Sequence, residues 1–477
     1  MRYLLFFFMM GSLSKLQGQF EHTYTPIQIT EDLPAELLDN VRQKTLMETA
    51  SQVDSLNSTD AIEFYAYSNF ALNQTLWSGN VYFHDEIGQY LNRLVDYLLR
   101  DDPMLRGSIH IYATKLLSPN ATCFRDGSIF LNLSLLPYLE NEAQLAYILS
   151  HEISHFQLKH SLEQFKKGKE LKNQEAWEEN DSEKLLEILK YGREQELQAD
   201  LAGLNRILLS DYDASESLQA LKRLQLIDFT PSYPELDLKA LFQLPELPIE
   251  PSSIYFLNKS SPLYSKADND RQRSEEETSD STLSTHPSIE LRIEKLAEKL
   301  TNEKEIKGES FIFFDSAEFR RIQLISIFER VEKLSNRTLY VQALYLALRL
   351  AEDWPENQYL QEKAATSLFW LAYYAKQKNR DSILPPKINP AEVPFDILSN
   401  TFHYMSVEEY LDLGQAFVLH RLEKFPDSEQ LMILKARMYE LRSNREKSIE
   451  SYHTYLQTYP SGNHAPFARH KINTYTE

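Results

Sequence analysis

Two pairs of polar side chains, each pair spaced four residues apart, constrain the fold of this sequence more than any other feature. His151 and His155 frame the segment His-Glu-Ile-Ser-His, and Glu196 and Asp200 frame the segment Glu-Leu-Gln-Ala-Asp. An α-helix places residues i and i+4 on one face. The sequence therefore predicts two helices that each present a polar pair, and a fold that brings the two helices together.

The spacing of the two histidines is typical of a metal site on a helix. One Zn²⁺ ion can bridge two imidazoles at i and i+4, and Glu152 would then lie beside the open position as a base for water. Glu196 can supply the third ligand, and Asp200 can accept a hydrogen bond from the far nitrogen of a ligating imidazole. Two histidines, one carboxylate and an open position describe a catalytic rather than a structural zinc site. The alternative is a pair of surface helices that carry unrelated charged residues.

Composition narrows the remaining choices. The 477 residues include only 12 glycines, which is few for a hairpin-rich fold and indicates a mostly helical protein. A formal net charge of -20 argues against nucleic acid as a partner, because phosphate would be repelled. The single cysteine, Cys123, excludes an internal disulfide and a cysteine metal cluster. We expect it to be a small buried hydrophobic residue, with redox sensing as the alternative.

The segment around the histidine pair reads as a small sheet beside helices. Residues 107–114 alternate in the manner of a strand, and residues 128–133 form a second β-prone run. Asn141 is a suitable N-cap with a glutamine three residues later, so we expect a helix from there through both histidines. His160 is expected at the surface, because a spacing of five from His155 turns it away from the ligand face.

The C-terminal half is helical and aromatic, and it carries a weak repeat. Pro426 and Pro460 are 34 residues apart, which is the tetratricopeptide period, and Pro355 precedes Pro426 by 71 residues, close to two periods. The sequence therefore predicts a degenerate tetratricopeptide-like array. A generic helical bundle with proline in its loops is the alternative.

The N-terminus predicts export. Arg2 and the apolar run after it fit a secretory signal peptide better than a spanning helix, which needs about 20 apolar residues. No other segment is apolar over such a length, so we expect a mature chain without a transmembrane segment, in the bacterial periplasm or outside the cell. The predicted organisation is a signal peptide at 1–19, a segment of unassigned role at 20–77, an α+β domain at 78–308 and the helical array at 309–477.

The motifs around both polar pairs resemble those of the gluzincin metallopeptidases, the family that includes CAAX prenyl proteases and bacterial β-barrel assembly-enhancing proteases. The resemblance covers about residues 78–300 and rests on four segments in the family's order: NATCFRDGSIFLNLSLL, NEAQLAYILSHEISH, REQELQADLAG and THPSIELRI. It implies a zincin-like α+β peptidase domain. It also implies one Zn²⁺ ion per chain, bound by His151, His155 and Glu196. Glu152 would be the general acid and base, and Asp200 would be the carboxylate partner of one ligand.

The resemblance adds two expectations that the spacing alone does not supply. His286, in the segment Thr-His-Pro, would approach the metal as a fourth ligand or would donate to the oxyanion of the reaction. The alternative is a histidine that merely precedes a proline at a helix start. A strand at the sheet edge would bind extended substrate through its backbone, and its residues would be Ser128, Ile129, Phe130, Leu131 and Asn132.

We therefore expect an exported zinc endopeptidase that acts on unfolded or misassembled envelope proteins, with the repeats recruiting substrates or partners. Zinc would polarise the scissile carbonyl, and Glu152 would take a proton from the activated water and deliver it to the leaving amine. Outer-membrane proteins or their assembly machinery are the polypeptide partners that the resemblance implies. The polar stretch 268–284 is expected to be a mobile lid. The rival function is an interaction scaffold or chaperone with a latent zinc site; a metal hydrolase for small molecules is a weaker alternative.

Overall fold

The computed structural model describes most of the chain. The described residues are 20–28, 41–51, 56–83, 85–173, 182–225, 241, 244, 247, 289–303, 308–387 and 394–476. The predicted signal peptide, the polar stretch 268–284 and His286 lie outside them. Among the helices described, none combines the length and the apolar character that crossing a membrane requires.

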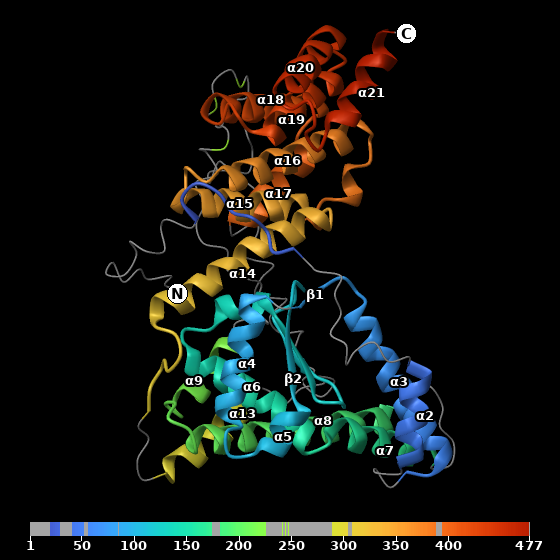
Figure 1. Ribbon diagram of the computed structural model, residues 1–477, viewed down its shortest axis with the longest axis vertical. Coiled ribbons are helices and arrows are strands. Elements are labelled where there is room, and N and C mark those ends of the chain that lie inside the picture. The colour runs from blue at the N-terminus through green and yellow to red at the C-terminus, as the bar shows by residue number, and fades with distance from the viewer. Residues whose placement is uncertain are drawn as a thin grey trace, which may run out of the picture. The chain divides into compact units, whose positions relative to one another are not determined.

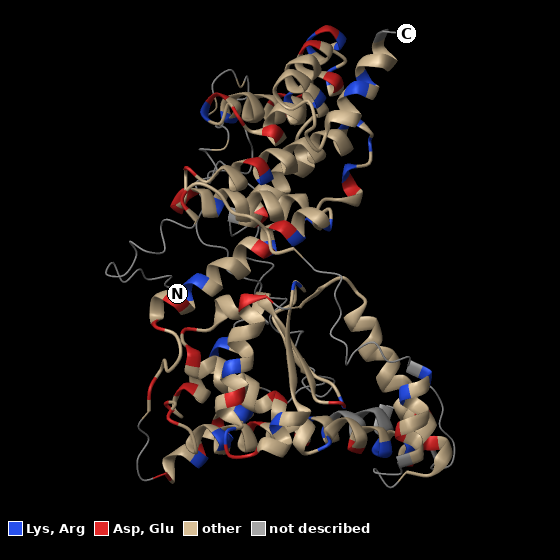
Figure 2. Ribbon diagram, viewed as in Figure 1, with Lys and Arg blue, Asp and Glu red and all other residues tan. Residues whose placement is uncertain are grey.

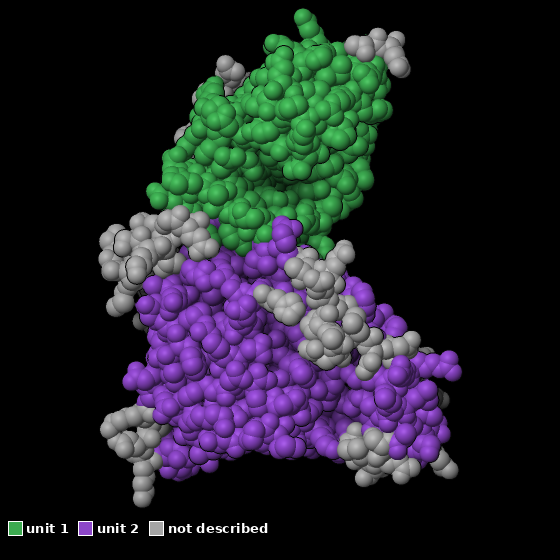
Figure 3. Space-filling model, in the orientation of Figure 1, with its two compact units in different colours: residues 1–26, 232–278, 331–477 green, residues 27–231, 279–330 purple. Residues whose placement is uncertain are grey.

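The chain divides into two compact units, which Figure 3 shows in different colours. The sheet unit consists of residues 27–231 and 279–330, and the helical unit of residues 1–26, 232–278 and 331–477. Most described residues are helical, and one four-stranded sheet lies in the sheet unit (Figure 1). The expected fold class, mostly α with an α+β domain followed by a helical array, is confirmed. Acidic and basic residues are interleaved along the helices of each unit (Figure 2).

The sheet unit contains the strands and the helices that surround them. Its elements, in chain order, are α2 (Val41–Ser51), α3 (Ser58–Leu76), β1 (Val81–Tyr82), α4 (Glu86–Leu98), α5 (Pro103–Ser108), β2 (His110–Thr114), β3 (Ala121–Cys123), β4 (Ser128–Asn132), the 3₁₀-helix η2 (Leu133–Tyr138), α6 (Glu142–Gln157), α7 (His160–Asn173), α8 (Ser182–Leu208), α9 (Glu216–Gln225), α13 (Ile289–Thr301) and the first part of α14 (Ser316–Asn336).

The strand order corrects one expectation from the sequence. The sheet runs β1-β2-β4-β3, with β2 and β4 parallel and the two outer pairs antiparallel. Residues Ser128, Ile129, Phe130, Leu131 and Asn132 do form a strand, β4, but β4 lies between β2 and β3 and all five residues are buried. The prediction that they form the edge strand is wrong. In the described sheet the edge beside β4 is β3.

A glycine turn is the reason for this order. Gly127 has a φ of +88°, and a Cβ atom there would lie 1.9 Å from the carbonyl oxygen of Ser108. The turn folds Ala121–Cys123 back onto β4, with Thr122 opposite Phe130. Three residues are too few to show an alternating pattern, so no periodicity in the sequence indicates β3.

The helix that carries the histidine pair begins as predicted. The Asn141 side chain accepts a hydrogen bond from the Gln144 backbone N–H at 3.0 Å, and the Gln144 side chain accepts one from the Glu140 N–H at 2.9 Å. The first contact satisfies a backbone donor that the first turn of a helix leaves open, and the second ties the residue before the N-cap to that turn. The helix, α6, ends at Gln157, and Lys159 takes a left-handed conformation with a φ of 54° before α7 starts.

Glu142, in the first turn of α6, is a fully buried carboxylate that joins distant parts of the sheet unit. It accepts hydrogen bonds from the hydroxyls of Tyr90 at 2.8 Å and Tyr212 at 2.7 Å. It also accepts three backbone N–H bonds, from residues 312, 313 and 314, at 2.8 to 3.1 Å. A buried carboxylate needs this many donors, because its desolvation otherwise costs several kcal/mol.

This contact explains why the compact units do not follow the predicted division at residue 308. Residues 312–314 are bound to Glu142, and the Gln323 amide of α14 donates to the carbonyl oxygens of Leu136 at 3.0 Å and Leu139 at 2.5 Å. The sheet unit therefore extends to residue 330.

The helical unit contains seven α-helices in its described C-terminal part. They are α15 (Tyr340–Asp353), α16 (Gln358–Lys376), α17 (Pro394–Tyr404), α18 (Val407–Lys424), α19 (Glu429–Leu441), α20 (Arg445–Thr458) and α21 (Ala465–Thr476). The last residues of α14 and the short 3₁₀-helix η6 (Arg380–Ser382), which lies between α16 and α17, also belong to this unit. Helices α18 to α21 pack consecutively, each on the next.

Three helices of this unit end in the same way. Trp354, Phe425 and Tyr459 have φ values of -128°, -122° and -124° with ψ of 67° to 69°, and each donates its N–H to the carbonyl four residues earlier. A proline follows each of them. These are the proline positions that suggested the repeat, so the local geometry recurs at the predicted interval. That the array is a tetratricopeptide array stays a prediction.

We expect the buried Glu142 to be a main determinant of the stability of the sheet unit. Glu142→Gln puts an amide N–H₂ among hydroxyl and backbone donors and should lower the free energy of unfolding of this unit by about 2 to 4 kcal/mol. Urea unfolding monitored by far-ultraviolet circular dichroism measures the free energy of unfolding. Glu163→Gln makes the same chemical change on α7, where the carboxylate faces only Lys166, and should cost less than about 0.5 kcal/mol. Equal losses in both variants would contradict the role of Glu142.

Candidate metal centre

Two packed helices supply the residues of the site. His151, Glu152 and His155 lie on α6, and Glu196 and Asp200 lie on α8, which packs against α6. Gly203 of α8 allows the close approach, because a Cβ atom there would lie 3.0 Å from the backbone nitrogen of His151. The absence of that side chain lets the two polar faces meet.

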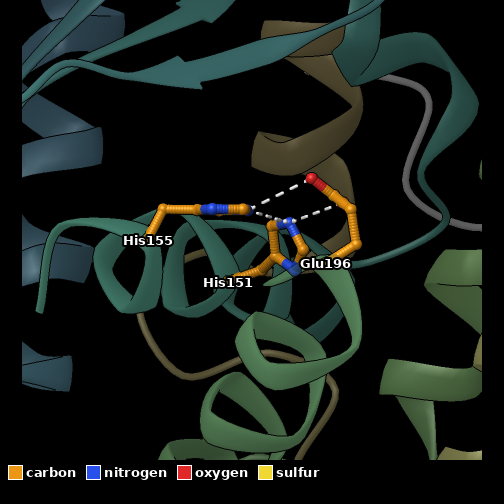
Figure 4. A group of neighbouring side chains, drawn as sticks. All are labelled: His151, His155 and Glu196. Atoms are coloured by element: carbon orange, nitrogen blue, oxygen red, sulfur yellow. Dashed lines mark hydrogen bonds and ion pairs between the residues drawn. The ribbon is translucent and has the colours of Figure 1, made fainter. Parts of the chain in front are cut away.

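Three ligand atoms converge between the helices, as Figure 4 shows. The Nε2 atoms of His151 and His155 are 3.0 Å apart, and each lies 3.5 Å from a carboxylate oxygen of Glu196. A tetrahedral ion with bonds of about 2.0 to 2.1 Å holds its ligand atoms about 3.3 Å from one another. The donor set and its spacing therefore fit one zinc ion without rearrangement, and the structure brings together the three residues predicted as ligands.

The charges of the three side chains are unequal. Burial opposes a charge on His151, but its hydrogen bonds with Asp200 and Glu196 raise its pKa to about 10. Burial and the neighbouring charge of His151 lower the pKa of His155 to about 3. Burial works against ionisation of Glu196 as well, yet the hydrogen bond and charge of His151 lower its pKa to about 2. Without a metal, a proton on His151 thus holds the group together, and a cation that enters must displace it.

Asp200 orients His151 as the sequence predicted. Its side chain is fully buried, and its Oδ1 atom lies 3.0 Å from Nδ1 of His151. Although burial opposes ionisation, hydrogen bonds from Arg292 and His151 lower the pKa of Asp200. An ionised carboxylate can only accept, so Nδ1 of His151 carries a proton and Nε2 faces the ligand cluster.

Two further residues that bind Asp200 were not identified from the sequence. Arg292 of α13 donates to both oxygens of Asp200, at 2.6 and 2.7 Å, and Tyr147 donates its hydroxyl to Oδ1 at 2.8 Å. Arg292 also lies 3.5 Å from Glu196. Tyr147 precedes His151 by four residues, so helical spacing could have indicated it. Arg292 comes from a distant helix, and spacing carries no such information.

The expectation that His160 lies at the surface is wrong. Its side chain is 5% exposed, its Nδ1 atom lies 2.9 Å from Nδ1 of His155, and its Nε2 atom lies 3.3 Å from the amide oxygen of Gln198. The left-handed residue Lys159 breaks the helical register before His160, so the spacing argument no longer applies.

The contacts of His160 set the tautomer of His155. The amide oxygen of Gln198 accepts a hydrogen bond, so His160 carries its proton on Nε2 and accepts at Nδ1. His155 then donates from Nδ1, and its Nε2 lone pair points into the ligand cluster. Both ligating imidazoles are thus oriented by a partner at the far nitrogen, Asp200 for one and His160 for the other.

Glu152 lies beside the ligands but is not one of the three converging groups. Burial raises its pKa to about 7, against the attraction of the charge on His151 and a hydrogen bond from the Cys123 backbone N–H. Cys123 itself is partly exposed, and burial of its sulfur raises the pKa of the thiol. Cys123 is therefore only partly buried, unlike the buried residue expected from the sequence, and its raised thiol pKa disfavours a reactive thiolate.

A cavity of about 430 Å³ opens over this group. His151, Glu152, His155 and Glu196 form its polar floor, and residues 119–123, which include the edge strand β3, form one wall. A polar group suited to a metal ion, a carboxylate beside it and the edge strand β3 thus line one cavity. The expected contribution of His286 stays a prediction.

Comparisons with known proteins agree with this geometry. The sequence model of peptidase family M48 matches residues 89–178 and 182–300. These ranges include the three converging residues and the partners that orient them, which are Tyr147, His160, Asp200 and Arg292. A protein of Yersinia pestis, the β-barrel assembly-enhancing protease, is 32% identical over 95 residues, which are 20% of this chain. The match spans only a fifth of that protein's length as well.

We expect His160 to strengthen metal binding although it is not a ligand. His160→Ala removes the acceptor that orients His155 and should weaken zinc affinity about 10- to 100-fold. Competition with a chromophoric chelator measures the dissociation constant. His464→Ala, at a half-buried histidine of the helical unit, is the matched control and should leave it unchanged. An unaltered affinity in folded His160→Ala would show that this contact does not support the site.

Proposed function

We propose that this chain is a zinc-dependent endopeptidase, since the model of peptidase family M48 matches residues 89–178 and 182–300. The observation that carries the proposal is the convergence of His151, His155 and Glu196 at the spacing of a tetrahedral ion, with Glu152 on the same cavity floor. Family membership supports a metallopeptidase, and the ligand geometry supports zinc as its metal.

The residues of the chain divide the work of peptide hydrolysis among them. His151, His155 and Glu196 would hold the ion, which when bound supplies Lewis-acid polarisation of a carbonyl and a lowered pKa for water. Glu152 is placed to accept a proton from the attacking water at its carboxylate and to deliver that proton to the nitrogen of the leaving amine. Asp200 and His160 keep both imidazoles oriented during these steps.

The edge strand β3 provides a backbone surface for an extended substrate. Asn132 N–H bonds to the Asn120 carbonyl and Phe124 N–H to the Ser128 carbonyl, so alternate residues of this strand pair with β4. By that alternation the backbone groups of Ala121 and Cys123 point away from β4, and of these groups the Cys123 N–H already donates to Glu152. A peptide that adds to this edge would be bound through its main chain, with little dependence on sequence.

We further propose that the chain is exported to the periplasm and acts there on unfolded or misassembled envelope proteins. The apolar run after Arg2 supports export, and the partial match to a β-barrel assembly-enhancing protease supports outer-membrane proteins or their assembly machinery as partners. The helical unit would recruit substrate or partner through its repeats.

A scaffold or chaperone is the second candidate, and one observation favours it. The helical unit already binds an extended segment: Asn357 donates to the carbonyl of Phe20 at 2.5 Å, and the backbone N–H of Gln358 donates to the carbonyl of His22 at 2.7 Å. The ring of Tyr24 packs on Tyr359 with centroids 5.4 Å apart. Helices that hold one extended chain in this way are suited to hold another.

Replacement of the proposed base separates the two functions. Glu152→Gln should retain one zinc ion per chain and lower the cleavage rate of an unfolded protein about 10²- to 10⁴-fold, because the proton acceptor is lost. Metal analysis and a gel-based cleavage assay measure both. Glu170→Gln, at an exposed carboxylate of α7, should behave as the unmodified protein. Full biological activity of Glu152→Gln in cells would favour the scaffold.

Removal of the metal gives an independent test. Dialysis against a chelator should abolish cleavage, and stoichiometric zinc should restore it, because the three ligands leave one coordination position open for the reaction. Cleavage that persists in metal-free protein would contradict the proposed function.

A further inference from the structure

A second cavity, of about 470 Å³, adjoins the metal cavity and has no part in the function argued so far. The two cavities share Cys123, His155 and Ser161 as wall residues. Cys123 is the last residue of the edge strand β3, and His155 is one of the three converging ligands. The second cavity therefore begins where the strand edge and the metal centre meet.

The N-terminal helices complete this cavity. Glu48 of α2 and Tyr65 of α3 line it. These helices lie side by side, and α3 packs on α7 through the rings of Phe64 and Phe165, whose centroids are 5.1 Å apart (Figure 1). Both helices precede residue 89, where the family match begins. The segment to which the sequence assigned no role thus forms a wall beside the reacting centre.

The inner wall of the cavity is apolar in character. Tyr65 is 2% exposed, and Phe156 presents a half-buried ring. The two charged residues of the inner wall, Glu48 and Arg125, form an ion pair with each other, and Arg125 lies 4.7 Å from the centre of the Tyr65 ring. Lys159 lines the cavity as an exposed residue. Because the inner charges offset one another, a large apolar group is a better guest than a charged one.

The direction of the edge strand determines which part of a substrate reaches this cavity. A peptide paired antiparallel with β3 runs from Cys123 toward Ala121. Its residues near Cys123 therefore precede those over the rest of the metal cavity, whose wall continues through residues 119–121. A cavity of 470 Å³ has the size of a small-ligand site and accommodates any aromatic or aliphatic side chain.

We propose that the second cavity is a specificity pocket, which binds a large apolar side chain of the substrate on the amino-terminal side of the scissile bond. The inference rests on the proposed peptidase function. It assigns to α2 and α3 the selection of exposed aromatic and aliphatic residues, which unfolded polypeptides present and folded ones bury.

Leu105 allows the size of the pocket to be changed in both directions. It lies on α5, is half-buried and lines the cavity. It is neither one of the three candidate metal ligands nor one of the residues that orient them. Leu105→Trp should fill the pocket and Leu105→Ala should enlarge it. The probes are internally quenched peptides that differ only in having Ala, Leu, Phe or Asp at one position, with each cleaved bond identified by mass spectrometry.

We expect the unmodified protein to cleave the Phe peptide at least about tenfold more efficiently, in kcat/KM, than the Ala or Asp peptide, with Phe on the amino-terminal side of the cut. Leu105→Trp should lower the Phe-to-Ala ratio about tenfold, and Leu105→Ala should maintain or raise it. A folding defect would lower cleavage of all peptides together and would leave the Phe-to-Ala ratio unchanged. Met104→Trp, at the exposed neighbour on α5, is the matched control and should keep the original ratio.

The outcomes distinguish this inference from the function on which it rests. If the unmodified protein cleaves no peptide and Glu152→Gln is indistinguishable from it, the peptidase function falls and the pocket with it. If the unmodified protein cleaves but neither Leu105 variant changes the ratio, or the change concerns the carboxyl-terminal side of the cut, the peptidase function stands and the specificity pocket is overturned.

Discussion

The buried carboxylate of Asp200 is the contact on which the sheet unit and its site both depend. It stands on α8, accepts from Tyr147 and His151 of α6, and pairs with Arg292 of α13. A buried ion pair is stable only when its remaining donors and acceptors are also satisfied. Here Tyr147 and His151 bind the Asp200 carboxylate in addition to Arg292. The same four bonds that hold three helices together therefore set the direction of the His151 imidazole, one of the three candidate metal ligands. Packing and chemistry are not separable at this position.

The metal cavity, the edge strand β3 and the adjoining apolar cavity are neighbours in space near that contact. Each is formed by a different part of the chain: the candidate ligands lie on α6 and α8, the edge is β3, and α2 and α3 form part of the wall of the adjoining cavity. An endopeptidase needs a reactive centre, a surface that extends the substrate and a means of choosing a bond. Under the proposed function, these three features of the sheet unit would meet those needs.

Local patterns in the sequence predicted the parts of the site that lie on single helices. The spacing of His151 and His155, the second pair on α8 and the Asn141 cap follow from helix geometry, and the structure contains all of them. The errors arose where the backbone departs from regular geometry. The turn at Gly127 makes β3 the edge, and the left-handed Lys159 returns His160 to the ligands. The partnership of Asp200 with Arg292 links residues 92 positions apart, beyond any periodic signal.

The five hydrogen bonds to Glu142 bear on how the protein can be dissected. A fragment that stops at residue 308 would lack the three main-chain donors at 312–314 and would leave the buried Glu142 side chain without them. It would also lack the Gln323 amide, which donates to the carbonyl oxygens of Leu136 and Leu139. The smallest fragment able to fold around the histidines should thus reach at least residue 330. Inactivity of a shorter fragment would reflect the loss of these stabilising contacts and would say nothing about the activity of the intact chain.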